Sequence, residues 1–282
     1  MNRKTKHPHL NTVNTHRSRM LLTAALLCSS FMCSSCSTNK LVYPGSRMEL
    51  PDAACGYPEQ AIVLQAEDGT QLRGWFFNRG ANTPLVAMYG GNGMNVGTFA
   101  HIAAADSTRS YILMNYRGYG NSAGEPSEEK IMADARYAIR YARTLMGNPG
   151  AQLYLAGYSL GSGVATQLAA TENPAGLVLI CPFDSMTSVA CNVVPFFPRL
   201  LPLDTWQSTK YAPRVTCPVT IMRADYDDVV PANSTEKLIR AFRTPPAIRH
   251  YPANHNNVFT ATGFTQDLLQ AMPVTDQSRF DF

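Results

Sequence analysis

From about residue 61 onward, the chain alternates between short apolar runs and longer segments in which apolar residues recur every three or four positions. The short runs predict buried β-strands, and the longer segments predict amphipathic helices. The predicted strands are two runs within 61–77, followed by 84–89, 110–116, 151–157, 176–182, 218–224 and 247–252. The predicted helices are 127–146, 160–170, 259–272 and 233–243, the last with Asn233 as its N-cap.

Strands that alternate with helices predict an α/β fold with a mostly parallel central sheet and helices on both faces. The dipeptide Asp68-Gly69 is a good hairpin turn, so the first two strands should form an antiparallel edge. The segment 186–206 is apolar but contains three prolines, which a core helix would not tolerate. We therefore expect a small cap over the strand ends at about 185–212.

The region before the regular pattern divides into two parts. Residues 36–60 contain several prolines and glycines and have no periodicity, which predicts a tether. Residues 1–35 resemble an export signal, because a basic region up to Arg19 precedes the apolar run Met20–Met32. Such a run is too short to span a bilayer as a helix. The expected organisation is a signal peptide (1–35), a tether (36–60) and one folded domain (61–282).

The end of the leader predicts a lipid anchor. Small residues before Cys36 resemble the lipobox of bacterial lipoproteins, although Cys33 stands where an aliphatic residue is usual. We expect an exported protein held to a membrane of the bacterial cell envelope by lipid on Cys36. The alternatives are a periplasmic or secreted protein and an uncleaved anchor. Export also permits disulfides, so a bond between Cys181 and Cys191 and two free thiols both stay open.

Composition agrees with a globular domain and argues against nucleic acid as a partner. The 282 residues are 45% hydrophobic and 16% charged, which is ample material for a core. The formal net charge is +4, but five of the 24 basic residues and none of the acids lie in residues 1–36. The remainder holds 19 basic and 20 acidic residues, so the folded body has no excess of positive charge.

The motif with the clearest chemistry is Gly157-Tyr158-Ser159-Leu160-Gly161, which reads GxSxG. It follows a predicted strand and precedes a predicted helix, as a nucleophile elbow requires. The turn would hold the Ser159 hydroxyl above the sheet, at the N-terminus of a helix. The alternative is an ordinary Gly-Ser turn into a helix.

A serine hydroxyl needs a base, and elimination among the histidines favours one of them. Three of the six lie in the leader, and His101 precedes the serine. His250 falls inside a predicted strand, where we expect its side chain to pack. His255 follows the last predicted strand, at the carboxyl edge of the sheet, so it is the predicted base.

The base needs a carboxylate, and "RADYDDVVP" (223–231) supplies three candidates directly after a predicted strand: Asp225, Asp227 and Asp228. A calcium site is the alternative, but the cluster lacks the spread of oxygen ligands and the glycine of an EF-hand loop. Chain order alone leaves the choice among the three acids open.

An oxyanion hole needs two backbone N–H groups. One is expected from Leu160, directly after the nucleophile. The other is expected from Asn92, in the glycine-rich loop "GGNG" that follows the strand 84–89. A phosphate-binding loop is disfavoured, because neither GxGxxG nor GxxxxGK[ST] is present.

Together these residues resemble the α/β-hydrolase superfamily, and within it the branch that includes the bud-emergence-type proteins and the protein-depalmitoylating hydrolases. The resemblance covers about residues 61–272. The matching segments are "YGGNGMN" (89–95), "NYRGYGNSAGEPSE" (115–128), "GYSLGSGVA" (157–165), "CPFDSM" (181–186), "CPVTIMRADYDDVVP" (217–231) and "NHNN" (254–257). The chain departs from the family pattern at Gly90, Ala224 and Asn254, where His, Gly and Gly are usual.

The resemblance implies an α/β-hydrolase fold and assigns the acid. The family's acid loop matches Asp227 to Pro231, which makes Asp227 the third member of a triad with Ser159 and His255. Asp225 and Asp228 are then loop acids, of which one could pair with Arg223. In the same resemblance, Arg117 to Gly120 form a structural loop beside the site, and Arg117 is expected to be a buttress, with a substrate ligand as the alternative.

The sequence therefore predicts a serine hydrolase that cleaves a carboxylic ester or thioester of a small or acylated substrate, with no cofactor and no metal. The alternatives are a serine peptidase on the same fold and a non-catalytic binding lipoprotein.

Overall fold

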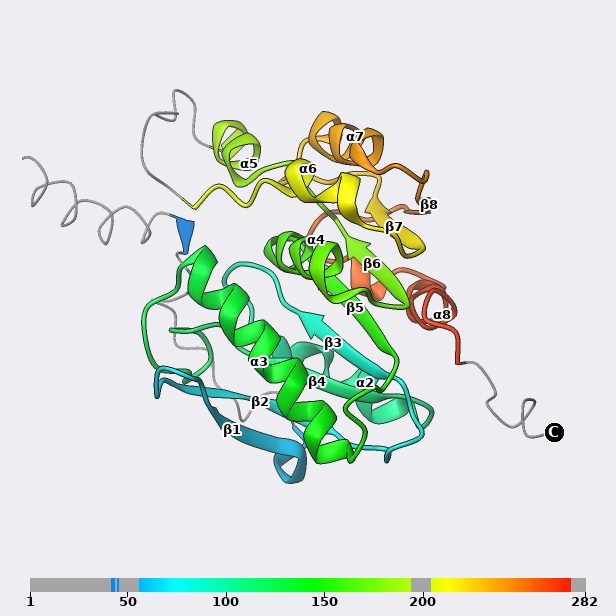
Figure 1. The fold of residues 1–282 in the computed structure, drawn as a ribbon. Helices are drawn as coiled ribbons and strands as arrows, with labels where there is room; N and C mark the ends of the chain where they lie inside the picture. Colours follow the sequence, from blue (N-terminus) through cyan, green and yellow to red (C-terminus); the bar gives the residue numbers. More distant parts are fainter. Residues whose placement is uncertain (1–41, 44, 46–55, 194–203, 275–282) are drawn as a thin grey trace, which may run out of the picture.

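The computed structural model describes residues 42–43, 45, 56–193 and 204–274, and its centre is a single eight-stranded sheet (Figure 1). The strand order is β1-β2-β4-β3-β5-β6-β7-β8. β2 pairs antiparallel with both β1 and β4, and every other neighbouring pair is parallel. The strands are β1 Ala61–Gln65, β2 Gln71–Phe77, β3 Leu85–Tyr89, β4 Ser110–Met114, β5 Leu153–Tyr158, β6 Gly176–Ile180, β7 Val219–Ala224 and β8 Ala247–Tyr251.

The burial of each strand follows from its place in the sheet. Every residue of the central strands β3, β4, β5 and β6 is buried, because helices cover both of their faces. The edge strand β1 has one buried residue, Leu64. These features confirm the predicted mostly parallel sheet, its antiparallel edge and its helical layers.

Two hydrophobic cores lie on the two faces of the sheet. One joins the sheet to α3 and α4 and extends to Leu238 of α7, and the other joins it to α2 and α8 (Figure 1). The helices are α2 Ala100–Ala105, α3 Glu128–Met146, α4 Leu160–Glu172, α5 Met186–Val193, α6 Ser208–Tyr211, α7 Ala232–Ala241 and α8 Phe264–Gln270. Short 3-10 turns are η3 Pro58–Gln60, η4 Val96–Phe99, η5 Ala212–Arg214 and η6 Val258–Thr260.

The long helix α3 has a residue that favours a helix terminus at each end. The Ser127 side chain accepts a hydrogen bond from the Lys130 N–H, and acidic residues occupy the first turn. The helix ends at Gly147, whose φ of 72° is left-handed and favours glycine.

Three details of the helix prediction were wrong. The 3-10 turn η4 and the helix α2 were not predicted. The α2 sequence "AHIAAA" has almost no contrast between a polar and an apolar face. α7 begins at Ala232 after Pro231, so Asn233 lies inside the helix and is not its cap. The expected helix 259–272 is split into η6 and α8, because Gly263 between them adopts φ 81°.

Part of the predicted tether packs on the domain. Val42 is 6% exposed and Tyr43 is fully buried. The Tyr43 hydroxyl donates to Asp204 Oδ2 at 2.7 Å and accepts from Trp206 Nε1 at 2.8 Å. The domain boundaries at residues 36 and 61 stay predictions, and the predicted signal peptide and Cys36 lie outside the described residues.

The predicted cap region is described in part. α5 and α6 stand at its two ends (Figure 1), and residues 194–203 between them lie outside the described part of the chain. Among the described helices, none is both long enough and apolar enough to cross a membrane.

Candidate active site

Ser159 occupies the sharp turn between β5 and α4. Its φ of 51° and ψ of −116° lie outside the regions that L-residues normally populate, so the surrounding structure must hold it there. A Cβ on Gly161 would stand 2.3 Å from the Tyr89 carbonyl oxygen, and one on Gly157 would stand 2.1 Å from the Gly161 oxygen. Only glycine fits at these two positions, which explains the spacing of the motif.

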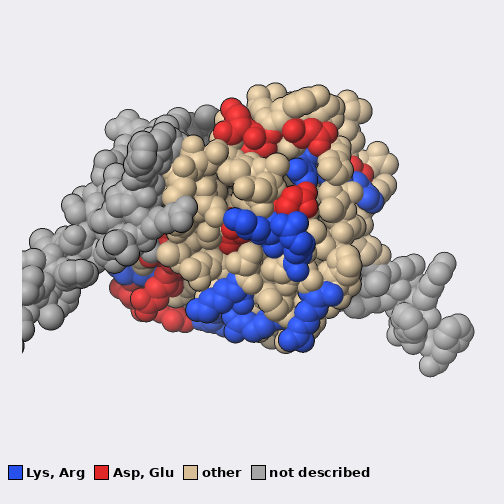
Figure 2. All heavy atoms as spheres, turned by 90° about the horizontal axis from the view of Figure 1, so that it is seen from above, with Lys and Arg blue, Asp and Glu red and all other residues tan. Residues whose placement is uncertain are grey.

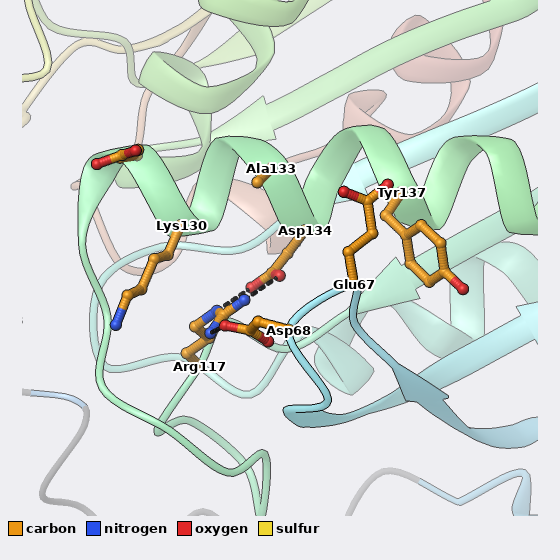
Figure 3. Close-up of a pocket in the computed structure, with 8 residues that line it drawn as sticks. Glu67, Asp68, Arg117, Lys130, Ala133, Asp134 and Tyr137 are labelled. Atoms are coloured by element: carbon orange, nitrogen blue, oxygen red, sulfur yellow. Dashed lines mark hydrogen bonds and ion pairs between the residues drawn. The ribbon is translucent and has the colours of Figure 1, made fainter.

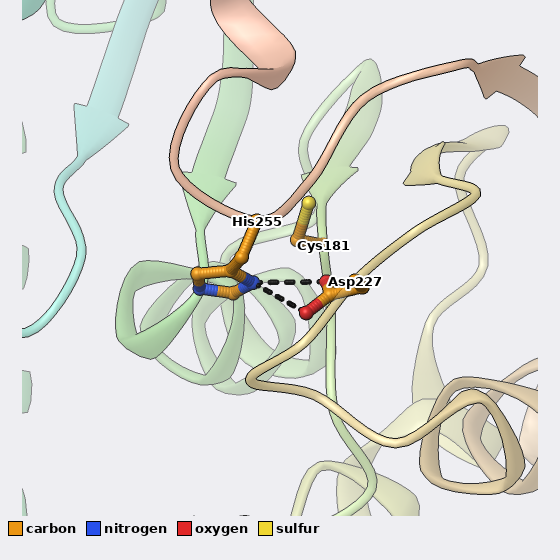
Figure 4. A group of neighbouring side chains, drawn as sticks. All are labelled: Cys181, Asp227 and His255. Atoms are coloured by element: carbon orange, nitrogen blue, oxygen red, sulfur yellow. Dashed lines mark hydrogen bonds and ion pairs between the residues drawn. The ribbon is translucent and has the colours of Figure 1, made fainter.

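The structure brings Ser159, His255 and Asp227 together from three different loops. His255 Nε2 lies 3.0 Å from Ser159 Oγ. His255 Nδ1 lies 2.9 Å from each carboxylate oxygen of Asp227 (Figure 4). His255 is 4% exposed, so bulk water competes little for these contacts. The chain order and the contacts match a Ser-His-Asp constellation.

Asp227 is held as an ionised acceptor. Its Oδ1 accepts the backbone N–H groups of Val229 at 3.0 Å and Val230 at 2.8 Å. Burial alone would raise the pKa of Asp227, but the hydrogen bond from His255, its positive charge when protonated and the two backbone N–H groups bring the pKa below its ordinary value. The carboxylate is therefore suited to orient and stabilise an imidazolium.

The neighbouring acids have other surroundings. Asp225 Oδ1 lies 2.7 Å from His250 Nδ1, and Asp228 is exposed. The expectation that His250 packs inside the sheet was wrong, because β8 is an edge strand and the His250 side chain is 57% exposed. Arg223 binds Glu236 of α7 at 2.5 Å instead of a loop acid.

The glycine loop after β3 lies directly against the serine. A Cβ on Gly91 would stand 2.7 Å from the Tyr158 ring and 3.5 Å from Ser159 Cβ, so this close approach requires glycine. The side chain of Asn92 is fixed at both ends. Its Nδ2 donates to the Val42 carbonyl at 2.6 Å, and its Oδ1 accepts from the Tyr119 hydroxyl at 2.6 Å. The backbone N–H groups of Leu160 and Asn92 remain our predicted oxyanion donors.

Sequence reasoning missed the support that Tyr158 provides. The Tyr158 hydroxyl donates to the His255 carbonyl at 3.0 Å, and its ring centroid lies 5.1 Å from that of the imidazole. The ring of Phe259 packs edge-on against Tyr158 at 4.6 Å. The position directly before the nucleophile was the available signal, because an aromatic side chain there reaches over the sheet edge toward the histidine loop.

Cys181 lies beside the acid and was also missed as a neighbour of the site (Figure 4). Its thiol is buried, and burial together with the negative charge of Asp227 raises its pKa, so it is a neutral thiol. Its sulfur, an Asp227 oxygen and a His255 nitrogen lie within 4.8 Å of one another, a donor set that zinc accepts. Because Asp227 and His255 already bind each other, we assign no metal here.

Cys181 and Cys191 are free thiols in the structure, as is Cys217. The disulfide that the sequence left open is therefore not formed between Cys181 and Cys191.

The guanidinium of Arg117 lies among charged side chains beside α3. It donates to both oxygens of Asp134, at 2.6 and 2.7 Å, and to Asp68 at 2.5 Å. These pairs form one wall of a hollow of about 180 Å³ between α3 and the β1–β2 hairpin (Figure 3). None of Ser159, Asp227 and His255 lines this hollow, and the contacts of Arg117 fit the expected buttress role.

Comparison with known proteins agrees with the fold. A model of the α/β hydrolase fold family matches residues 83–205. The uncharacterized protein Rv2307c of Mycobacterium tuberculosis is 35% identical over 212 residues, which cover 73% of this chain and 75% of the relative. The chain belongs to the α/β-hydrolase fold family.

Other relatives have names that concern membranes or lipids. An uncharacterized membrane protein of Saccharomyces cerevisiae, YNL320W, is 28% identical over 246 residues, which cover 80% of this chain and 85% of that protein. The lysophosphatidylserine lipase ABHD12 of Gallus gallus is 28% identical over 185 residues, which cover 57% of this chain and 47% of that protein.

Solved structures share the fold at low sequence identity. An α/β hydrolase from Vibrio vulnificus has a TM-score of 0.66 with 19% identity, covering 83% of this chain and 92% of that one. The esterase Pf2001 of Pyrococcus furiosus has a TM-score of 0.63 with 13% identity, covering 79% and 93%. Similarity at this level establishes the fold alone.

Proposed function

We propose that this protein is a serine hydrolase that cleaves a carboxylic ester or thioester through an acyl-enzyme. The observation that carries the proposal is the contact of Ser159 Oγ with His255 Nε2 at 3.0 Å, while His255 Nδ1 binds Asp227 at 2.9 Å. This arrangement supplies a nucleophile, a base and an orienting carboxylate without a cofactor.

In the first half of the reaction, Ser159 Oγ attacks the carbonyl carbon and His255 Nε2 takes its proton. The negative oxygen that forms is held by the N–H groups of Leu160 and Asn92. When the tetrahedral intermediate collapses, the alkoxide or thiolate leaves with the proton from His255. The acyl group remains on Ser159.

In the second half, His255 takes a proton from water, and the resulting hydroxide attacks the acyl carbonyl. His255 then returns the proton to Ser159 Oγ, and the carboxylic acid is released. Asp227 stabilises the imidazolium in both halves, which its lowered pKa favours because it stays ionised.

The names of similar proteins are consistent with the ester class. Among them are an esterase of Pyrococcus furiosus and a lysophosphatidylserine lipase of Gallus gallus. The narrower resemblance, to the bud-emergence-type and depalmitoylating hydrolases, belongs to the same proposal. So does the export of the chain as a lipoprotein anchored through Cys36.

A fluorophosphonate probe tests the proposal. The probe should label wild type and Ser107→Ala equally and fail to label Ser159→Ala, since Ser107 is an exposed serine far along the chain from the motif. The same three proteins should be run against p-nitrophenyl esters, acyl thioesters and peptide substrates. Absence of labelling in the folded wild type would indicate a non-catalytic binding protein. Cleavage of peptides alone would indicate a serine peptidase.

A further inference from the structure

Two consecutive residues of the turn after β5 hold the two ends of His255. Ser159 Oγ lies 3.0 Å from the imidazole Nε2, and the Tyr158 hydroxyl donates to the His255 backbone carbonyl at 3.0 Å. Tyr158 is the last residue of β5, and the φ of 51° at Ser159 turns the chain directly after it. The backbone and the ring of His255 are therefore both fixed relative to the same turn.

The ring of Tyr158 contacts both the histidine loop and the glycine loop. Its centroid lies 5.1 Å from that of the imidazole, with the two planes tilted by 37°. Gly91 approaches the same ring so closely that a Cβ there would stand 2.7 Å from it. Phe259 packs edge-on against the ring and is itself packed against Phe99 and Phe264, at 5.2 and 5.5 Å. One side chain thus spaces the candidate base and the predicted oxyanion loop.

The hydrogen bond of the Tyr158 hydroxyl is sheltered from water. Figure 2 shows a face of the domain that carries both basic and acidic side chains, and water weakens ion pairs on such a surface. Tyr158 is 6% exposed, so its hydrogen bond lies away from that competition. Burial raises the pKa of Tyr158 well above its ordinary value, and the charges of Asp227 and Asp228 add to this, so the hydroxyl keeps its proton and can donate.

The other hydrogen bonds of the histidine loop are local and exposed. Asn254 Oδ1 accepts from the backbone N–H groups of Asn256 at 3.1 Å and Asn257 at 3.2 Å. These bonds fix the shape of the loop, because both partners belong to it. They do not fix its distance from β5, which the Tyr158 hydroxyl spans.

We propose that Tyr158 is a positioning residue of this hydrolase: its hydroxyl holds His255 at the distance where the imidazole takes the proton of Ser159, and its ring keeps the Gly91 loop against the nucleophile. The inference rests on the proposed hydrolase reaction. Tyr158 acts through His255, so its loss should slow the chemical step and leave substrate binding nearly unchanged.

The test removes one hydroxyl from each of two buried tyrosines of β5. Tyr158→Phe keeps the ring and deletes the donor. Tyr154→Phe is the matched control, because Tyr154 is 2% exposed and its hydroxyl also donates to a backbone carbonyl, that of Pro273, at 2.5 Å. For both variants and wild type, kcat and KM are measured with p-nitrophenyl acetate. Active sites are counted by complete labelling with a fluorophosphonate, and the melting temperature is recorded.

We expect Tyr158→Phe to lower kcat per active site about tenfold, with KM within about twofold of wild type. Tyr154→Phe should keep both values within about twofold, while its melting temperature falls about as much as that of Tyr158→Phe. A merely structural role of Tyr158 would reduce the number of labelled sites and the melting temperature but not kcat per site. Equal kcat per site in the two variants would therefore overturn the proposal.

A second variant covers the case in which Tyr158→Phe does not fold. Phe259→Leu leaves the Tyr158 hydroxyl in place and loosens the packing of its ring, so kcat per site should fall several-fold. An unchanged kcat per site in Phe259→Leu would then overturn the proposal. If Ser159→Ala hydrolysed p-nitrophenyl acetate as fast as wild type, the proposed function itself would fail, whatever the effect of Tyr158→Phe.

Discussion

Asp227 and Asp225 stand two residues apart and bind different histidines. Asp227 reaches the buried His255 through both carboxylate oxygens at 2.9 Å, while Asp225 binds the exposed His250 at 2.7 Å. Both acids lie in the loop that follows β7, and they differ in where their histidines lie. One imidazole also touches Ser159, and the other lies on the outer edge of the sheet.

This relationship predicts that two matched substitutions, one at each acid, differ greatly in their effect on kcat/KM. Asp227→Asn should lower kcat/KM for a p-nitrophenyl ester by roughly 10⁴-fold, because an amide cannot hold the imidazole in the working tautomer. Asp225→Asn should change kcat/KM by less than about threefold, since its pair is exposed and contributes little. Steady-state kinetics of both purified variants measures this. A crippled Asp225→Asn with an active Asp227→Asn would reassign the acid.

A second prediction concerns acid stability. The pKa of Asp227 is lower in the folded protein than in the unfolded chain, so its ionised form stabilises the fold above the unfolded pKa. That contribution should be lost as the pH falls below about 4. The difference in melting temperature between wild type and Asp227→Asn should therefore shrink from pH 7 to pH 3. A difference that stays constant would contradict the lowered pKa.

The close packing of the GxSxG turn predicts how much stability is lost when a methyl group is added to one of its glycines. Gly161→Ala should destabilise the protein by about 3 kcal/mol, because the new Cβ would lie 2.3 Å from a backbone oxygen that cannot move freely. Gly150→Ala is the control, since its Cβ would meet only the end of the Asn148 side chain, at 3.6 Å. We expect it to change stability by less than about 0.5 kcal/mol. Urea denaturation of the two variants gives both values.

The contacts of Arg117 predict that its removal lowers the stability of the fold without a comparable loss of kcat. Arg117→Ala would leave the buried Asp134 unpaired, which should cost about 3 kcal/mol. The exposed pair of Arg140 with Glu67 is the matched control, and Arg140→Ala should cost less than about 1 kcal/mol. The kcat of folded Arg117→Ala on p-nitrophenyl acetate should stay within a few fold of wild type. A loss of kcat comparable to that of Ser159→Ala would instead place Arg117 in the reaction.

The sequence predicted most of the fold because its signals are local. Apolar runs marked the six strands that follow the hairpin, and Asp68-Gly69 marked the turn between β1 and β2. The helix prediction failed where polar and apolar residues did not alternate clearly, and where the backbone conformation of one residue ended a helix. "AHIAAA" became α2 without an amphipathic pattern, and Gly263 divided the last predicted helix.

The candidate site was predicted in a different way. Motif and chain order selected Ser159 and His255, but chain order left three acids, and only the family resemblance favoured Asp227. The contacts of Tyr158 with His255 and of Val42 with Asn92 carried no sequence signal that we recognised. They join residues 97 and 50 positions apart, and no local pattern records which distant backbone a side chain will reach.

By itself, the sequence determined the order of strands and helices, the GxSxG turn and the position of the candidate base after the last strand. These follow from burial periodicity and from the few residues that tolerate a sharp turn. Tertiary structure alone decided that Asp225 and Asp227 bind different histidines and that the Val42 carbonyl accepts a hydrogen bond from Asn92, in the loop beside Ser159. Such pairings depend on which sheet edges and loops pack together, and packing is a property of the whole folded chain.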